Sequence, residues 1–261
     1  MKNLPNTAPI QFKKNWLEKL YRTYNKREFI HPDPLEFVYH YSKPQDREVA
    51  GLIASTLAYG NVKQILKSTQ WVLEKLGSSP SDFLKQESPT TLRHLTQNFK
   101  HRFTTDEDLA HLLLGIRKNL HHYGSLYECF LEGYSKKETS ILPALILFVD
   151  KLIGHQGTYG AHLLPQPTKN SACKRLHMFL RWMVRKDEVD PGGWEALSPS
   201  KLIVPVDTHM HHISLKLGLT KRKQANLKTA LELTAAFARI SPNDPVKYDF
   251  SLTRLGILKI H

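Results

Sequence analysis

One aspartate stands where a carboxylate can be held ready for chemistry. Asp207 follows the short apolar run Leu202–Val206 and directly precedes an amphipathic pattern over Thr208–Leu217. Aspartate is a favoured helix N-cap, because its carboxylate accepts hydrogen bonds from the free backbone N–H groups of the first turn. The positive end of the helix dipole also favours the ionised carboxylate. The pattern therefore predicts a fixed negative charge that can stabilise a cation beside it.

The elements that must position this aspartate are predicted to be helical. Apolar residues recur at helical spacing along most of the chain, and strand signals are sparse, Leu202–Val206 being the best of them. The expected helices span residues 10–25, 34–41, 43–57, 62–76, 81–85, 90–99, 106–121, 126–133, 141–153, 171–186, 208–217, 225–240 and 245–258, and residues 154–170 are expected to form a loop. The fold class predicted from this pattern is all-α.

Charge is the clearest guide to a partner. The chain has 261 residues, 41% of them hydrophobic, and a formal net charge of +13 with 14 histidines in addition. This length predicts a globular protein of two lobes or two small domains. A strong positive charge predicts a polyanionic partner such as DNA or RNA, although it is also compatible with a solvated surface.

The cysteines and the termini limit the compartment and the cofactors. Cys129 and Cys173 are far apart and form no ligand motif, so the chain cannot hold a four-cysteine iron–sulfur cluster. No signal core and no membrane-length apolar run is found, and we expect a cytoplasmic protein with both thiols free. Nothing in the sequence implies a metal or an organic cofactor.

The segment around Asp207 carries a family resemblance. Val206-Asp-Thr-His209, followed by Lys216-Leu-Gly-Leu219, resembles the helix-hairpin-helix (HhH-GPD) DNA glycosylase superfamily at its essential aspartate. His212 stands where that superfamily usually has arginine, and its usual hairpin sequence is absent. The resemblance implies a single unit 1–261 with a cleft between two lobes, 44–170 and 1–43 plus 171–261. It also implies that Asp207 lies at the cleft.

Over nearly its full length the chain is similar to a bacterial family of unknown function. The shared segments are the helix around Ala50–Ser55, Ser171–Leu176 through Arg181–Asp187, Pro205–His209 and Asp244–Phe250.

The glycosylase resemblance assigns further roles, each with a structural alternative. The archaeal oxoguanine glycosylases have a long interval between their lysine and aspartate, and by this analogy Lys174 is the candidate nucleophile and Lys169 the second choice. Lys174 near a helix start and beside Arg175 favours a neutral, reactive amine. The alternative is a lysine that binds phosphate or only solvent.

Two further groups of residues are predicted to contact the nucleic acid. Tyr59 and Asn61 follow a buried helix where the superfamily inserts a wedge into DNA, although a helix cap and a turn explain them equally well. The candidate phosphate-binding residues are Lys169, Arg175, Lys201, Lys221, Arg222 and Lys223. The candidate walls of a base pocket are Trp182, Trp194, Tyr248 and Phe250, which are residue types found more often in a core.

The function predicted from these residues is excision of a damaged base from double-stranded DNA, with oxidised bases among the candidates and with a lyase step through a lysine Schiff base. We expect a monomer with no membrane association. The alternatives are a non-catalytic nucleic-acid-binding protein and an enzyme acting on RNA or modified nucleotides. A metal-dependent amidohydrolase, suggested by His209 and His211, is disfavoured because no long series of strands and helices follows.

Overall fold

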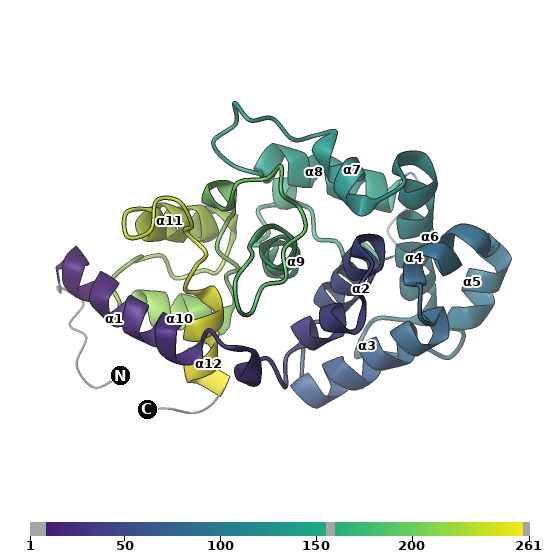
Figure 1. Ribbon diagram of the computed structural model, residues 1–261, viewed down its shortest axis with the longest axis horizontal. Helices are drawn as coiled ribbons and strands as arrows, with labels where there is room; N and C mark the ends of the chain where they lie inside the picture. Colours follow the sequence, from purple (N-terminus) through teal and green to yellow (C-terminus); the bar gives the residue numbers. More distant parts are fainter. Residues whose placement is uncertain (1–8, 155–159, 258–261) are drawn as a thin grey trace. The chain divides into compact units, whose positions relative to one another are not determined.

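The computed structural model describes residues 9–154 and 160–257, and over these residues the chain is helical (Figure 1). The α-helices are α1 (Ile10–Tyr24), α2 (Pro44–Thr56), α3 (Val62–Leu76), α4 (Pro80–Gln86), α5 (Pro89–Thr96), α6 (Asp106–Tyr123), α7 (Leu126–Leu131), α8 (Leu142–Ile153), α9 (Lys174–Val184), α10 (Thr208–Lys216), α11 (Leu227–Ala238) and α12 (Asp249–Ile257). The 3₁₀ helices are η1 (Arg27–Phe29), η2 (Pro34–His40), η3 (Pro167–Lys169) and η4 (Pro199–Lys201). The all-α prediction is confirmed for the described part of the chain.

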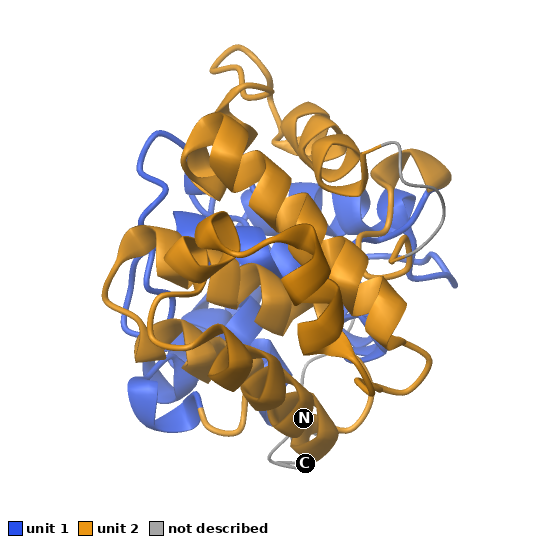
Figure 2. Ribbon diagram, turned by 90° about the vertical axis from the view of Figure 1, so that its right-hand side faces the viewer, with its two compact units in different colours: residues 1–30, 170–261 blue, residues 31–169 orange. Residues whose placement is uncertain are grey.

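The chain divides into two compact units (Figure 2). Unit 1 consists of residues 1–30 and 170–261, and unit 2 consists of residues 31–169. Residues 31–43, which the sequence-based division placed with the terminal lobe, belong to unit 2 because η2 packs against α2 and α3.

In unit 2 the long helix α6 packs against α4, α5, α7 and α8. Its Gly115 allows a close approach to α8, because a Cβ atom at this position would lie 2.1 Å from the backbone oxygen of Leu152. Asn119, one turn further along α6, donates hydrogen bonds to the carbonyl oxygens of Gly115 and Lys151. The thiol of Cys129 is buried and donates to the side-chain oxygen of Asn119.

Helix α2 is buried over most of its length, and two of its acidic side chains serve other helices of unit 2. Asp46 accepts a hydrogen bond of 2.8 Å from the backbone N–H of Ser81 in the first turn of α4. Glu48 accepts one of 2.8 Å from Leu126 at the start of α7. Both carboxylates thus satisfy N–H groups that a helix start leaves without an intrahelical partner.

In unit 1 helix α9 is buried along most of its length, from Leu176 to Val184. Its Phe179 ring packs edge-on against Trp194 at a centroid distance of 5.3 Å. Helix α12 packs against α1 and α10, so the two ends of the unit meet on one element. Lys174 is the first residue of α9, and the buried residues that follow it fix the position of the helix start.

The segment Leu202–Val206 is not a strand, and this prediction was wrong. The segment is extended and buried, but no other extended segment of the described chain pairs with it. The backbone N–H of Val204 donates instead to the hydroxyl of Thr234 in α11. The helix expected from residue 171 begins at Lys174, because Cys173 has a left-handed backbone conformation that a helix does not accept.

Within the described residues, no helix combines the length and the apolar character needed to cross a bilayer.

Candidate active site

Asp207 is the N-cap of α10. Its Oδ1 atom accepts a hydrogen bond of 2.8 Å from the backbone N–H of Met210, and its backbone is extended. The apolar residues that precede it are buried: Val204 and Val206 are 1% and 2% exposed. The chain is therefore anchored on both sides of the aspartate, and the cap fixes the direction of its carboxylate.

Lys174 opens α9 after a strained residue. Cys173, the N-cap, has φ 44° in the left-handed region, which is uncommon for a residue with a Cβ atom. The hydroxyl of Ser171 accepts a hydrogen bond from the Cys173 backbone N–H. The side chain of Cys173 makes no cap hydrogen bond to the start of α9. Backbone strain of this kind is found often at functional sites, and here it sets the direction in which the chain enters the helix at Lys174.

The structure brings these two side chains together. Lys174 Nζ lies 3.7 Å from Asp207 Oδ2, and the side chains are 29% and 31% exposed. The distance is in the range of an ion pair but longer than an N–H···O hydrogen bond. Because the Oδ1 atom is engaged by the helix, the Oδ2 atom is the one that faces the lysine. The pair is accessible from solvent and can reach a bound macromolecule.

A third charged group, which the sequence analysis missed, lies behind the pair. Asp249 is buried at the start of α12 and forms an ion pair of 2.5 Å with Arg181 of α9. Burial raises the pKa of its carboxyl, Arg181 and Lys174 oppose this rise, and Asp207 adds to it. Asp249 is therefore close enough to both site residues to interact with them electrostatically. Its sequence signal was a single carboxylate between Tyr248 and Phe250, a position where a charge must be paired.

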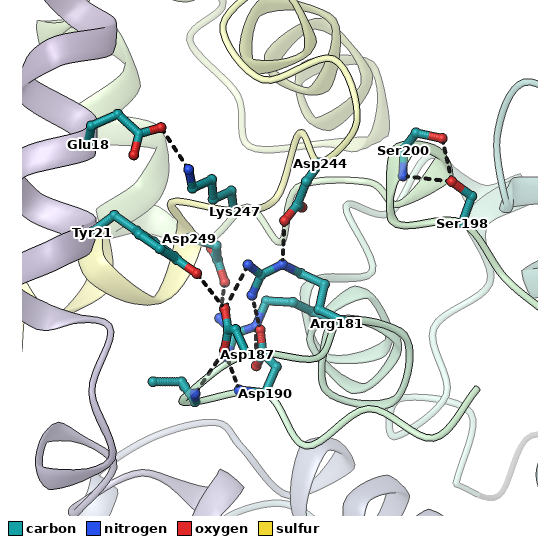
Figure 3. A network of polar contacts seen from close by, with 12 residues as sticks. Glu18, Tyr21, Arg181, Asp187, Asp190, Ser198, Ser200, Asp244, Lys247 and Asp249 are labelled. Carbon is teal, nitrogen blue, oxygen red and sulfur yellow. Dashed lines mark hydrogen bonds and ion pairs between the residues drawn. The ribbon is translucent and has the colours of Figure 1, made fainter. Parts of the chain in front are cut away.

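Asp249 is one end of a buried arginine–aspartate network (Figure 3). Its members are Arg181, Arg185, Asp187, Asp190, Asp244 and Asp249. Asp190 is fully buried between the two arginines, and burial raises its pKa to about 6 although both arginines lower it. Removing one partner from such a network leaves a buried charge without compensation, which costs several kcal/mol. The network therefore holds α9 and α12, and with them Lys174 and Asp249, in a fixed arrangement.

Tyr21 of α1 extends the network to a third helix. Its hydroxyl donates a hydrogen bond of 2.9 Å to Asp187, which also accepts from the backbone N–H groups of Val189 and Asp190 (Figure 3). Burial tends to raise the pKa of the Asp187 carboxyl, but Arg185 and these hydrogen bonds lower it below its usual value.

The predicted phosphate-binding residues of unit 1 lie on three elements. Arg175 is the second residue of α9, Lys201 ends η4, and Lys221–Lys223 form an exposed loop between α10 and α11. His211 of α10 holds this loop, because its Nε2 atom donates to the Arg222 carbonyl oxygen at 2.8 Å. The Arg222 side chain pairs with Glu232. The basic loop is thus attached to the helix that Asp207 caps.

The predicted pocket walls are core residues in this structure. The side chains of Trp182, Trp194, Tyr248 and Phe250 are each 0–1% exposed. Phe250 packs under the guanidinium groups of Arg181 and Arg254, and the Tyr248 hydroxyl donates to Glu18. These four side chains therefore do not line an open pocket as the unit stands. They are core residues, as their residue types already suggested.

The remaining predicted residues belong to unit 2. Asn61 caps α3 by accepting from the Lys63 backbone N–H, as the cap alternative proposed. Tyr59 is half-buried, and its hydroxyl donates to the His101 carbonyl oxygen at 2.8 Å. Lys169 is exposed at the end of η3. The structure thus brings Lys174, not Lys169, together with Asp207 within one unit.

Of the histidines that follow Asp207, His211 holds the basic loop in place. His209 is exposed, and the Nε2 atom of His211 is engaged by the Arg222 carbonyl oxygen. Among residues 9–154 and 160–257, no three histidine, cysteine, aspartate or glutamate side chains lie close enough to hold a metal ion together.

A family model matches most of the chain. Its description is "Protein of unknown function (DUF2400)", and the match covers residues 33–258, which include Lys174, Asp207 and Asp249. No curated protein and no solved structure matches the chain.

Proposed function

The chain belongs to the DUF2400 family, and we propose that it is a DNA base-excision enzyme with Lys174 as nucleophile and Asp207 as the acid–base and electrostatic group. Membership in a family of unknown function confirms that part of the sequence-based identification. The observation that carries the proposal is the pair itself: a lysine at one helix start faces a carboxylate at another, with 3.7 Å between Nζ and Oδ2. The proposal includes the two-lobed HhH-GPD type of fold.

The pair can supply the chemistry of glycosidic bond cleavage. The neutral Lys174 amine attacks the sugar C1′ atom, and the base departs with the electrons of the glycosidic bond. Asp207 Oδ2 takes a proton from the attacking amine, and its charge stabilises the cationic character that develops on the sugar. The sugar ring oxygen then leaves C1′ and takes the second amine proton as the C1′–Nζ Schiff base forms. This intermediate permits strand cleavage.

DNA is supported as the substrate by charge and by the helix start. The net charge of +13 attracts phosphates, and Arg175 and Lys221–Lys223 lie on elements attached to α9 and α10. No side-chain cap hydrogen bond is made by Cys173 at the beginning of α9, and the positive end of the helix dipole lies beside Lys174. A damaged base must leave the stack to reach any such site. The proposal specifies the base only as a damaged one, with oxidised bases as the first candidates to test.

Borohydride trapping tests the proposal. The purified chain is incubated with duplexes that carry oxidised, deaminated or abasic sites, and a Schiff base is reduced to a stable adduct. We expect an adduct with a duplex containing a damaged base, its loss in Lys174→Ala, and its persistence in Lys169→Ala. The Asp207→Asn variant should lower base release by at least about 100-fold.

Three outcomes would contradict this assignment. An adduct that survives in Lys174→Ala and disappears in Lys169→Ala would move the nucleophile to unit 2. No adduct and no base release on any duplex, together with salt-sensitive DNA binding, would favour a non-catalytic binding protein. Base release from RNA but not from DNA would show that the substrate is RNA.

A further inference from the structure

A tight hairpin in unit 2 displays an aromatic ring to solvent. Phe103 is 62% exposed, more than Ile10, Phe12 and Leu231, the other exposed large apolar residues of the described chain. It lies in a two-residue turn, because His101 and Thr104 exchange backbone hydrogen bonds of 3.0 and 2.9 Å. The ring contacts Tyr59 and His162 of unit 2, but most of its surface remains exposed to solvent.

The other residue of this turn is an arginine in a conformation that favours glycine. Arg102 has φ 56°, in the left-handed region. Its side chain lies over Gly60, where a Cβ atom would be 2.6 Å from Arg102 Cδ. A glycine at position 102, opposite Gly60, would adopt this backbone conformation without strain. The chain instead keeps a strained arginine, and strain of this kind points to a role for the side chain.

The hairpin is held rigidly from below. His101 is fully buried, its Nε2–H donates to the Tyr59 carbonyl oxygen, and its Nδ1 atom accepts from the Ser68 hydroxyl of α3. The Tyr59 hydroxyl donates to the His101 carbonyl oxygen at 2.8 Å. The Tyr59 ring then stacks on Phe103, with centroids 4.9 Å apart and planes at 29°. The exposed Phe103 ring is therefore supported from below by Tyr59, which His101 holds in place.

Cations and a small hollow surround this ring. A hollow of about 120 Å³ beside the hairpin is lined by Gln64, Lys67, Ser68, Trp71, Asn98, Phe99 and Lys100. Lys63 and Lys67 lie one turn apart on the exposed side of α3, and Arg102 lies at the hairpin tip. Within the described part of the chain, none of Lys63, Lys67, Lys100 and Arg102 forms an ion pair with a carboxylate. The surface is thus both aromatic and positively charged.

We propose that this hairpin surface, formed by Tyr59, Lys67, Lys100, Arg102 and Phe103, binds DNA at an unpaired segment, with Phe103 stacked on an exposed base. Aromatic rings supply stacking for any base, and flanking lysines and arginines neutralise phosphates. The four cations, which form no ion pair within the described residues, and the net charge of +13 favour this polyanion over a protein partner. The inference rests on the proposed function only in taking DNA as the ligand.

The experiment measures binding and stacking with the full chain. The probe is a fluorescein-labelled DNA duplex with an internal unpaired stretch, and a second probe carries 2-aminopurine in that stretch. Anisotropy gives the affinity, and quenching of 2-aminopurine reports stacking. We expect Phe103→Ala to weaken binding at least about 5-fold and to abolish the quenching. Phe12→Ala removes a similarly exposed phenylalanine of α1 and should change neither signal.

Arg102→Gly separates the charge from the fold. Glycine accepts φ 56° without strain, so the thermal midpoint should stay the same or rise. Binding should still weaken several-fold, and the slope of log affinity against log salt should fall by about 1.

Equal affinity and quenching in Phe103→Ala and Phe12→Ala would overturn the proposal, as would a preference for fully paired duplex or for RNA alone. Borohydride trapping keeps the two proposals apart. Loss of binding in Phe103→Ala without any lysine adduct in the unaltered protein would support the surface and contradict the glycosylase. A Lys174 adduct with unaltered binding in Phe103→Ala would do the reverse.

Discussion

At the scale of single residues, the two oxygens of Asp207 have separate roles. Oδ1 caps α10, and Oδ2 faces Lys174. Asparagine keeps an oxygen for the cap but loses the negative charge, whereas alanine loses both. The structural and the chemical contributions of one side chain are therefore separable by substitution.

We expect Asp207→Asn to leave the free energy of unfolding nearly unchanged and Asp207→Ala to lower it by about 1 kcal/mol, since asparagine and aspartate are equally good caps. Both variants should lose base release. Urea denaturation at pH 7 checks the stabilities, and the same preparations serve for trapping. A large loss of stability in Asp207→Asn would mean that the charge itself holds the fold.

His177 makes a second prediction at this scale. It is fully buried in α9, neither ring nitrogen has a hydrogen-bond partner among the described protein atoms, and burial lowers its pKa to about 3. The unfolded chain binds a proton near pH 6.5 and the folded chain does not. The contribution of His177 to the free energy of unfolding is therefore fully present above pH 6.5. It is lost as the pH falls toward 3, by about 2 kcal/mol at pH 5.

His177→Leu should remove this loss, so that the variant gains about 2 kcal/mol relative to the unaltered protein between pH 7.5 and pH 5. Thermal and urea unfolding over this range give the comparison. Exposed His121→Leu is the control and should keep the original pH dependence. Parallel curves for the His177 variant and the unaltered protein would show that this histidine is protonated in the fold.

Sequence reasoning identified the residues whose local signals are strong. Asp207 before an amphipathic pattern predicted a cap, and the structure has that cap. The pairing of Lys174 with Asp207 came only from a resemblance, because no local pattern relates two helix starts so far apart in the chain. Asp249 was missed, and the four aromatics were left between pocket and core, for the same reason: burial and partners depend on packing between distant segments.

At the scale of elements, contacts between helices and other segments depend on more than the hydrophobic pattern of each segment. Hydrophobic periodicity predicted most helix positions. It carries no information on contacts between helices, and so it did not predict that Asp46 and Glu48 of α2 accept hydrogen bonds from the starts of α4 and α7. The extended segment Leu202–Val206 looked like a strand because buried extended chain has the same apolar pattern, with or without a partner.

The contact between α6 and α8 gives a prediction for unit 2. A Cβ atom at Gly115 would lie 2.1 Å from the Leu152 backbone oxygen, so Gly115→Ala must push the helices apart. We expect the free energy of unfolding to fall by about 3 kcal/mol. Lys118→Ala, at an exposed position of the same helix, should change it by less than about 0.5 kcal/mol. Equal stabilities in urea would show that α8 adjusts without cost.

At the scale of the whole molecule, charge is treated differently in the two units. Unit 1 places two arginines inside a network with four aspartates, so these cations serve the fold. In unit 2, Lys67, Lys100 and Arg102 of the hairpin surface form no ion pair with any carboxylate of the described residues. A composition summary counts both kinds of cation alike. The sequence therefore predicted a polyanionic partner and candidate contact residues for it, but of the residues that form the hairpin surface it named only Tyr59.

The two buried cysteines are internal reporters, one in each unit. Burial raises the pKa of Cys129 in unit 2 to about 12 and that of Cys173 in unit 1 to about 11, so neither thiol is reactive while its unit stays closed. Alkylation by iodoacetamide in rising urea, followed by peptide mass spectrometry, should therefore record the opening of each unit separately. Coincident labelling curves would mean that the two units unfold together, and separate curves would rank their stabilities without any added probe.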